Sequence, residues 1–160
     1  MGYDIYIQTA DGRRADGEEN YFRFELTARI RALDTMRNFG MLAELPYPAV
    51  PLLSAYGLTE GDLKTGVRHA LDKANLVAEY RSAYRAVMDA AEPEPTGIPT
   101  YKLAYNDGAL VTVAEITAAL AAYEAHPNID VSEMPLGDPI WPHWIAFLRR
   151  AKEHGGLRAH

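Results

Sequence analysis

The first apolar pattern in the chain has a period of two residues. Tyr3, Ile5 and Ile7 alternate with more polar positions, and this alternation is typical of a strand with one buried face. We therefore expect a strand over residues 3–9. The segment 21–26, YFRFEL, either returns as a second, antiparallel strand or leads directly into a helix.

Capping residues delimit two helices. Thr27 is a suitable N-cap for a helix over 27–39, and Gly40 can adopt the left-handed conformation that ends one. Farther along, Thr112 and Glu115 have the spacing of a capping box, in which each side chain accepts a backbone N–H of the other residue. That box predicts a helix over 112–125.

The last helix is predicted from both of its ends. Asp138-Pro139 reads as N-cap and first helical residue, because proline lacks the N–H that is left unpaired at that position. Gly155-Gly156 ends the helix, and residues 157–159 are then a candidate strand beside residues 3–9.

The middle of the chain carries the longest helical pattern. Apolar residues recur there at spacings of three and four, which predicts a helix over 60–92, roughly 50 Å long. Such a length means that the helix breaks near Asn75 or projects and pairs with a partner, for example as a homodimer through helix 60–92. The seam of this helix consists of Leu63, Val67, Ala70, Ala74, Val77, Tyr84, Met88 and Ala91.

Three prolines in residues 92–99 exclude a continued helix. Residues 100–105 are expected to form a short strand, and the Asn-Asp-Gly turn that follows would return residues 109–111 beside it. The pattern therefore predicts an α+β fold that is mostly helical. Its small antiparallel sheet would consist of the N-terminal strand or strands and the 100–111 hairpin, with the C-terminal strand as a further candidate.

Composition fits one globular domain over 1–160. The chain is 48% hydrophobic and 24% charged, and the segment 92–99 is too short to separate two independent domains. There is no cysteine, which excludes disulfides, thiolate catalysis and cysteine-ligated zinc. No apolar run is long enough for a membrane helix and the start lacks a signal-peptide pattern, so we expect no membrane partner and a cytoplasmic location.

The net charge of −6, from 16 basic and 22 acidic residues, argues against a nucleic-acid partner, because phosphate binding needs clustered cations. The charge is uneven: residues 93–140 are acidic and residues 141–160 are basic. This separation is consistent with solvated faces of one fold or with an electrostatically complementary partner surface.

No motif indicates an enzyme. The chain has no glycine-rich phosphate loop, no serine nucleophile elbow and no histidine pair at metal-binding spacing, so we expect no metal and no cofactor and assign no catalytic residue. The alternative is a polar cleft near Lys102, Asn106 and Asp107 that binds a small ligand or catalyses a reaction. Turn formation also explains Asn106 and Asp107, because their side chains hydrogen-bond the nearby backbone, and it is the more common role of such residues.

Aromatic residues supply the candidates for an interaction surface. There are ten tyrosines and two tryptophans, and aromatic and arginine side chains are enriched at protein interfaces. The same residues could instead form the core, and both interpretations stay open. The candidates are Tyr80, Tyr84, Trp141, Trp144, Arg149 and Arg150.

Four segments carry a resemblance to a known family. They are the opening MGYDIYI, the segment YFRF at residues 21–24, the block from Lys102 through the Asn-Asp-Gly turn and Val111 to Glu115, and the ending that runs from Trp144 to Arg158 as W..FLR.A...GGLR. Together they resemble an uncharacterised small-protein family of actinobacteria and actinobacteriophages. The family has no assigned activity, so no catalytic residue is transferred. The resemblance implies a viral or mobile-element setting, in which small acidic proteins often bind host proteins. We therefore expect a non-enzymatic protein-binding module, phage-encoded and directed at a host protein.

Overall fold

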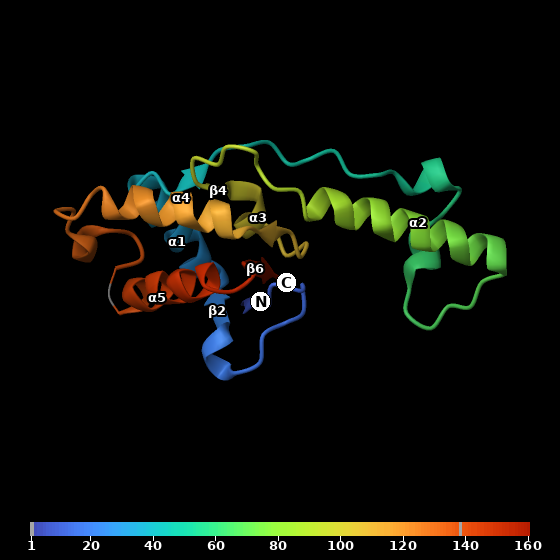
Figure 1. The fold of residues 1–160 in the computed structure, drawn as a ribbon, viewed down its shortest axis with the longest axis horizontal. Coiled ribbons are helices and arrows are strands. Elements are labelled where there is room, and N and C mark those ends of the chain that lie inside the picture. The colour runs from blue at the N-terminus through green and yellow to red at the C-terminus, as the bar shows by residue number, and fades with distance from the viewer. Residues whose placement is uncertain (1, 138) are drawn as a thin grey trace. The chain divides into compact units, whose positions relative to one another are not determined.

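The computed structural model describes residues 2–137 and 139–160, and the chain forms two compact units (Figure 1). Unit 1 consists of Met1–Pro46 and Ala91–His160, and unit 2 consists of Tyr47–Ala90. Helices and a small antiparallel sheet make up the fold, so the expected α+β class is confirmed. The expectation of one domain stays a prediction.

Unit 1 contains a four-stranded antiparallel sheet. The strands lie in the order β2-β1-β6-β5, so the C-terminal strand lies between the N-terminal strand and β5. In the register of the sheet, Ile5 of β1 faces Phe22 on one side and Ala159 on the other. The expected strands 3–9, 21–26 and 157–159 are thus present, with the bounds β1 Gly2–Ile7, β2 Tyr21–Glu25, β5 Leu110–Val111 and β6 Leu157–Ala159.

The helices of unit 1 share one hydrophobic core with one face of this sheet. Ile5 and Leu157 from the strands pack in the same cluster as Met36, Ile116 and Leu148 from three helices. Figure 1 shows α4 and α5 side by side. The helices are α1 Leu26–Asn38, α3 Thr100–Ala104, α4 Val113–Glu124 and α5 Ile140–Lys152, and a parallel pair is formed by β3 Leu42–Ala43 and β4 Ile98–Pro99.

The opposite face of the sheet is polar and aromatic. The ring centroids of Tyr6 and Tyr21 are 5.1 Å apart, and the guanidinium carbon of Arg14 lies 3.4 Å from the Tyr6 ring centroid. The Tyr21 hydroxyl donates to Asp4 Oδ1 at 2.5 Å, and Arg23 also contacts that oxygen. These side chains bind one another, as on the solvated face of an antiparallel sheet.

Two details of unit 1 differ from the predicted helix ends. The first helix begins at Leu26 with Glu25 at the N-cap position, so Thr27 lies inside it. Its end is as expected, with Gly40 at a φ of 70°. Asp138, the predicted N-cap of the last helix, lies outside the described residues, and Pro139 directly precedes α5.

The predicted 100–111 hairpin is wrong. Residues 100–104 form the helix α3, and β5 pairs with β6 instead of with that segment. Lys102 and Leu103 are both buried although they are consecutive. A strand with one solvent face turns consecutive side chains to opposite sides, whereas a helical turn can direct both inward.

Unit 2 corrects the predicted helix 60–92. Only α2, Leu71–Met88, is an α-helix, and residues 60–63 form a short 3-10 helix. Thr59 and Asp62 make the expected capping box, but Lys64 is extended and Gly66 has a φ of 84°, so the chain turns away before α2. The helix through which a homodimer was expected is therefore shorter than predicted, and the homodimer itself stays a prediction.

The core of unit 2 is small. Leu58, Val77 and Tyr80 form its buried cluster, with partly buried side chains from the 3-10 helix Leu53–Tyr56 and from α2 around them. The ring of Tyr80 lies 5.5 Å from that of Tyr56 and 6.2 Å from that of Tyr84. The contact between Tyr56 and Tyr80 holds α2 against the preceding segment, whereas Tyr80 and Tyr84 both belong to α2. Across the described residues, no helix in either unit combines the length and the apolar character that crossing a membrane requires.

Candidate functional site

The structure does not bring the predicted polar site together. Lys102 is 1% exposed, and its Nζ lies 2.8 Å from Glu115 Oε1 and 2.7 Å from the Leu110 carbonyl oxygen. Asn106 and Asp107 are exposed in the turn before β5. A ligand at that turn would therefore not reach the Lys102 ammonium.

Glu115 uses both carboxylate oxygens inside unit 1. Oε2 accepts the Thr112 backbone N–H at 2.8 Å, and Oε1 accepts the backbone N–H of Glu92 at 3.3 Å as well as the Lys102 ammonium. The carboxylate is completely buried. This pair fixes the start of α4, and its burial separates the Glu115 carboxylate from solvent.

The two tryptophans are core residues, which corrects their assignment to an interaction surface. Trp141 and Trp144 are each 1% exposed. Trp141 stacks on Phe39 with ring centroids 5.5 Å apart, and Trp144 meets Phe24 edge to face at 5.0 Å. The large area that an indole buries is used here between α5, α1 and the sheet.

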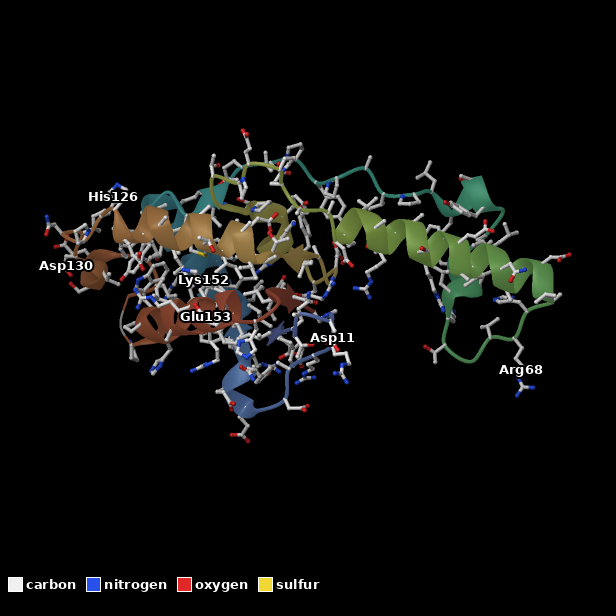
Figure 2. The ribbon with its side chains drawn as sticks, in the orientation of Figure 1. Asp11, Arg68, His126, Asp130, Lys152 and Glu153 are labelled. Carbon is white, nitrogen blue, oxygen red and sulfur yellow. The ribbon has the colours of Figure 1, made fainter. Side chains whose placement is uncertain are left out.

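Arg149 and Arg150 lie at the surface, near the end of α5. Arg149 pairs with Glu124 at 3.4 Å, and Arg150 donates to the Glu19 carbonyl oxygen at 2.6 Å. Figure 2 labels Lys152 and Glu153, which follow them in the chain. Cations in the last turn of a helix are stabilised by the helix dipole, so a structural role accounts for this group without a partner.

Tyr80 and Tyr84 contribute mainly to the interior of unit 2. Tyr80 is buried and Tyr84 is half-buried. Their rings pack toward Tyr56 and toward each other, as described above, and only Tyr84 keeps a partly exposed surface. The i, i+4 spacing identified a real contact, but it is a contact within the unit.

Unit 2 exposes apolar side chains that the sequence did not point to as an interaction surface. Leu71 is 75% exposed and Leu52 is 68% exposed, and Val67 and Leu76 are also exposed. Leu71 and Leu76 lie off the predicted seam of the long helix. The sequence signal that could have identified these two exposed leucines is that each is an apolar residue outside the predicted seam.

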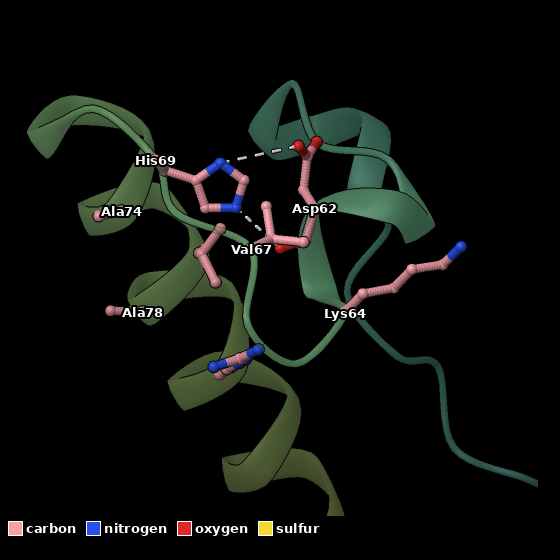
Figure 3. Close-up of a pocket in the computed structure, with 8 residues that line it drawn as sticks. Asp62, Lys64, Val67, His69, Ala74 and Ala78 are labelled. Atoms are coloured by element: carbon pink, nitrogen blue, oxygen red, sulfur yellow. Dashed lines mark hydrogen bonds and ion pairs between the residues drawn. The ribbon is translucent and has the colours of Figure 1, made fainter.

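A small hollow of about 230 Å³ lies between α2 and the segment before it (Figure 3). His69 closes one side, with Nε2 2.9 Å from the Asp62 carbonyl oxygen and Nδ1 4.0 Å from Asp62 Oδ1. Figure 3 shows the Lys64 side chain extending away from His69. The lining residues are Asp62, Lys64, Val67, His69, Ala74, Val77, Ala78 and Arg81.

The carboxylate in this hollow is fully engaged. Lys73 Nζ lies 2.8 Å from Asp62 Oδ1, and the Thr59 backbone N–H donates to Oδ2 at 2.9 Å. The ion-paired Lys73 ammonium, followed by the Thr59 N–H, lowers the pKa of Asp62 to about 2. A carboxylate with so low a pKa is a poor general base near neutral pH. The hollow is therefore better suited to binding than to proton transfer.

The residues that the structure describes contain no group of three or more His, Asp or Glu side chains placed to hold a metal ion. No protein-family model matches the chain, and searches of curated proteins and of solved structures found no similar protein.

Proposed function

We propose that this protein is a non-enzymatic protein-binding module and that unit 2 carries the contact surface. The observation that supports the proposal is the exposure of Leu52, Val67, Leu71 and Leu76 on one small unit. Covering exposed apolar side chains with another protein removes them from water, which is favourable.

The size of unit 2 adds a physical reason. Units of this length rarely bury enough apolar area on their own and are commonly stabilised by disulfides, metals or association. The chain has no cysteine, and the described residues form no metal cluster. Covering one leucine side chain contributes about 1.5–3 kcal/mol of favourable free energy. Association with a partner would therefore compensate for the small apolar area that unit 2 buries by itself.

The class of partner that we propose, a protein of a host cell, is suggested by the family resemblance described above. A phage or mobile-element setting makes a host-cell protein the first partner to examine. A second copy of the chain, docked through α2, is the competing partner.

The test uses the full-length protein with a photo-crosslinking amino acid at position 71, or at position 30 as the control. Ile30 is also an exposed apolar residue on a helix, but it belongs to unit 1. We expect a discrete crosslinked product in lysate from position 71 and none from position 30. Leu71→Asp should abolish capture of the same product by tagged protein, whereas Ile30→Asp should not.

Light scattering after size-exclusion chromatography separates the two partner classes. A monomer that crosslinks to a different protein supports the host-partner proposal, and a dimer that Leu71→Asp dissociates assigns the surface to self-association. Equal crosslinking from both positions, or capture that Leu71→Asp leaves intact, would show that unit 2 is not the contact surface.

A further inference from the structure

We infer that the uncovered stripe of α2 binds a partner segment in which an aliphatic side chain lies beside a carboxylate. This inference rests on the proposed function and names the chemistry of the partner. The aliphatic side chain enters the hollow in Figure 3, and the carboxylate faces the arginines that follow along the helix.

The stripe is defined by Leu71, Ala74, Ala78, Arg81 and Arg85, at successive spacings of three and four. Residues with this spacing share one face of a helix. All five are exposed, whereas Val77 and Tyr80 on the neighbouring face are buried. The stripe is apolar in its first half and cationic in its second.

The hollow fits a single side chain. Its volume of about 230 Å³ is below the roughly 300–1,000 Å³ of pockets that enclose whole small molecules. Val67, Ala74, Val77 and Ala78 supply apolar walls, and the two alanines leave the space that a larger residue would fill. An aliphatic side chain would displace water from these walls, which is favourable.

The charges favour an acidic neighbour for that side chain. The Arg81 guanidinium donates to the Leu63 carbonyl oxygen at 3.0 Å, and within the described part of the chain no carboxylate oxygen lies within 4 Å of it. Among the residues that the structure describes, Arg85 forms a loose ion pair with Asp89, at 3.9 Å. The charge of Asp62 is already neutralised by Lys73. A guanidinium without an acid partner binds a carboxylate well, often through two parallel hydrogen bonds.

The probe is N-acetyl-leucine, which carries the aliphatic side chain and the carboxylate, and the matched control is its uncharged amide. Both are titrated into the ¹⁵N-labelled full-length protein. We expect saturable shifts at backbone amides of residues 62–81, with a dissociation constant in the millimolar range for a ligand of this size. The acid should bind several-fold more tightly than the amide.

Three variants assign the contacts. Arg81→Gln should remove the preference for the acid, Ala78→Met should block both compounds by filling the hollow, and Arg68→Gln should change neither. Arg68 is an exposed cation of unit 2 that Figure 2 shows pointing into solvent, and it does not line the hollow.

Two results would overturn the inference. One is an equal response to acid and amide, or shifts that do not saturate at residues 62–81. The other is a shift of those amides with protein concentration alone, which would make a second copy the occupant. Either result leaves the crosslinking test at position 71 unaffected, so unit 2 could still be the contact surface for a partner of different chemistry.

Discussion

At the scale of single residues, Lys102 shows how strongly tertiary structure can constrain a charge. Lysine is almost never fully buried unless it is paired, and here the ammonium lies between Glu115 and the Leu110 carbonyl oxygen. Since Glu115 also accepts two backbone N–H groups, the ion pair links α3, the strand β5 and the start of α4. The pair is a structural element of unit 1.

Lys102→Met is therefore expected to lower the free energy of unfolding by about 3–5 kcal/mol, because it leaves the Glu115 carboxylate buried without its counterion. Denaturant unfolding followed by circular dichroism measures the change. The double variant Lys102→Met/Glu115→Gln should recover part of the loss, since it removes the uncompensated charge.

Arg149→Gln is the control, because it breaks the exposed ion pair with Glu124 and should leave unfolding close to that of the parent protein. If Lys102→Met and Arg149→Gln had the same small effect, the Lys102 pair would not be buried as described.

Asp62 gives a prediction on pH. Its pKa is lowered from 3.8 to about 2, first through the hydrogen-bonded Lys73 ammonium and then through the Thr59 backbone. The pKa of Asp62 in the folded protein lies below its ordinary value, so the ionised carboxylate stabilises the folded state. This stabilisation is complete above pH 3.8 and is lost as the pH falls through about 2. Carboxyl ¹³C NMR should show Asp62 titrating near pH 2, and Lys73→Gln should move its midpoint upward. An ordinary midpoint in both proteins would contradict the ion pair.

At the scale of elements, the C-terminal strand depends on the two glycines before it. β6 lies between β1 and β5, and Gly156 approaches the Val111 carbonyl oxygen so closely that a Cβ would collide with it. Gly156 also has a φ of 92°, which side-chain-bearing residues rarely adopt. Both features allow the chain to leave α5 and enter the sheet.

Gly156→Ala is expected to lower the free energy of unfolding by more than about 2 kcal/mol. The left-handed conformation alone costs an alanine about 1–2 kcal/mol, and the collision of its Cβ with the Val111 carbonyl oxygen adds to that cost. Gly12→Ala is the matched control: Gly12 has a φ of 84°, but a Cβ there would have nothing within 4 Å. The loss of stability in Gly12→Ala should therefore come only from the left-handed backbone conformation. Thermal unfolding compares the two, and equal losses would show that the approach to Val111 is unimportant.

At the scale of the whole molecule, the two units differ in how much apolar surface they bury. The core of unit 1 connects the sheet with α1, α4 and α5, whereas the core of unit 2 is centred on Leu58, Val77 and Tyr80. Local stability follows buried apolar contacts. Unit 2 should therefore open more readily than unit 1.

Hydrogen exchange with mass spectrometry tests this difference. Tyr80→Ala should remove most of the protection of residues 53–63 and 71–88, because it deletes one of three residues in the buried cluster, while the protection of the unit 1 sheet stays unchanged. Leu71→Ala is the control, because its side chain is exposed and its removal should leave protection in both units as it is. Loss of protection across the whole chain in Tyr80→Ala would mean that the units unfold as one.

Much of unit 1 could be predicted from sequence because its signals are local. The alternation around Ile5, the capping box of Thr112 and Glu115, and the positive φ of Gly40 each involve residues within a few positions of one another. The prediction of one helix over 60–92 was wrong for a related reason. The spacing of apolar residues is preserved across a break, so periodicity alone cannot detect the turn at Gly66.

The sequence by itself determined where strands, caps and turns could form, since these follow from backbone geometry and short-range hydrogen bonds. Only the tertiary structure decided which side chains are buried. It placed Trp141 and Trp144 in the core, left Leu71 in solvent and paired Lys102 with Glu115. Burial and ion pairing depend on which distant segments come together, and the free energy of that choice is shared among many residues that no local pattern connects.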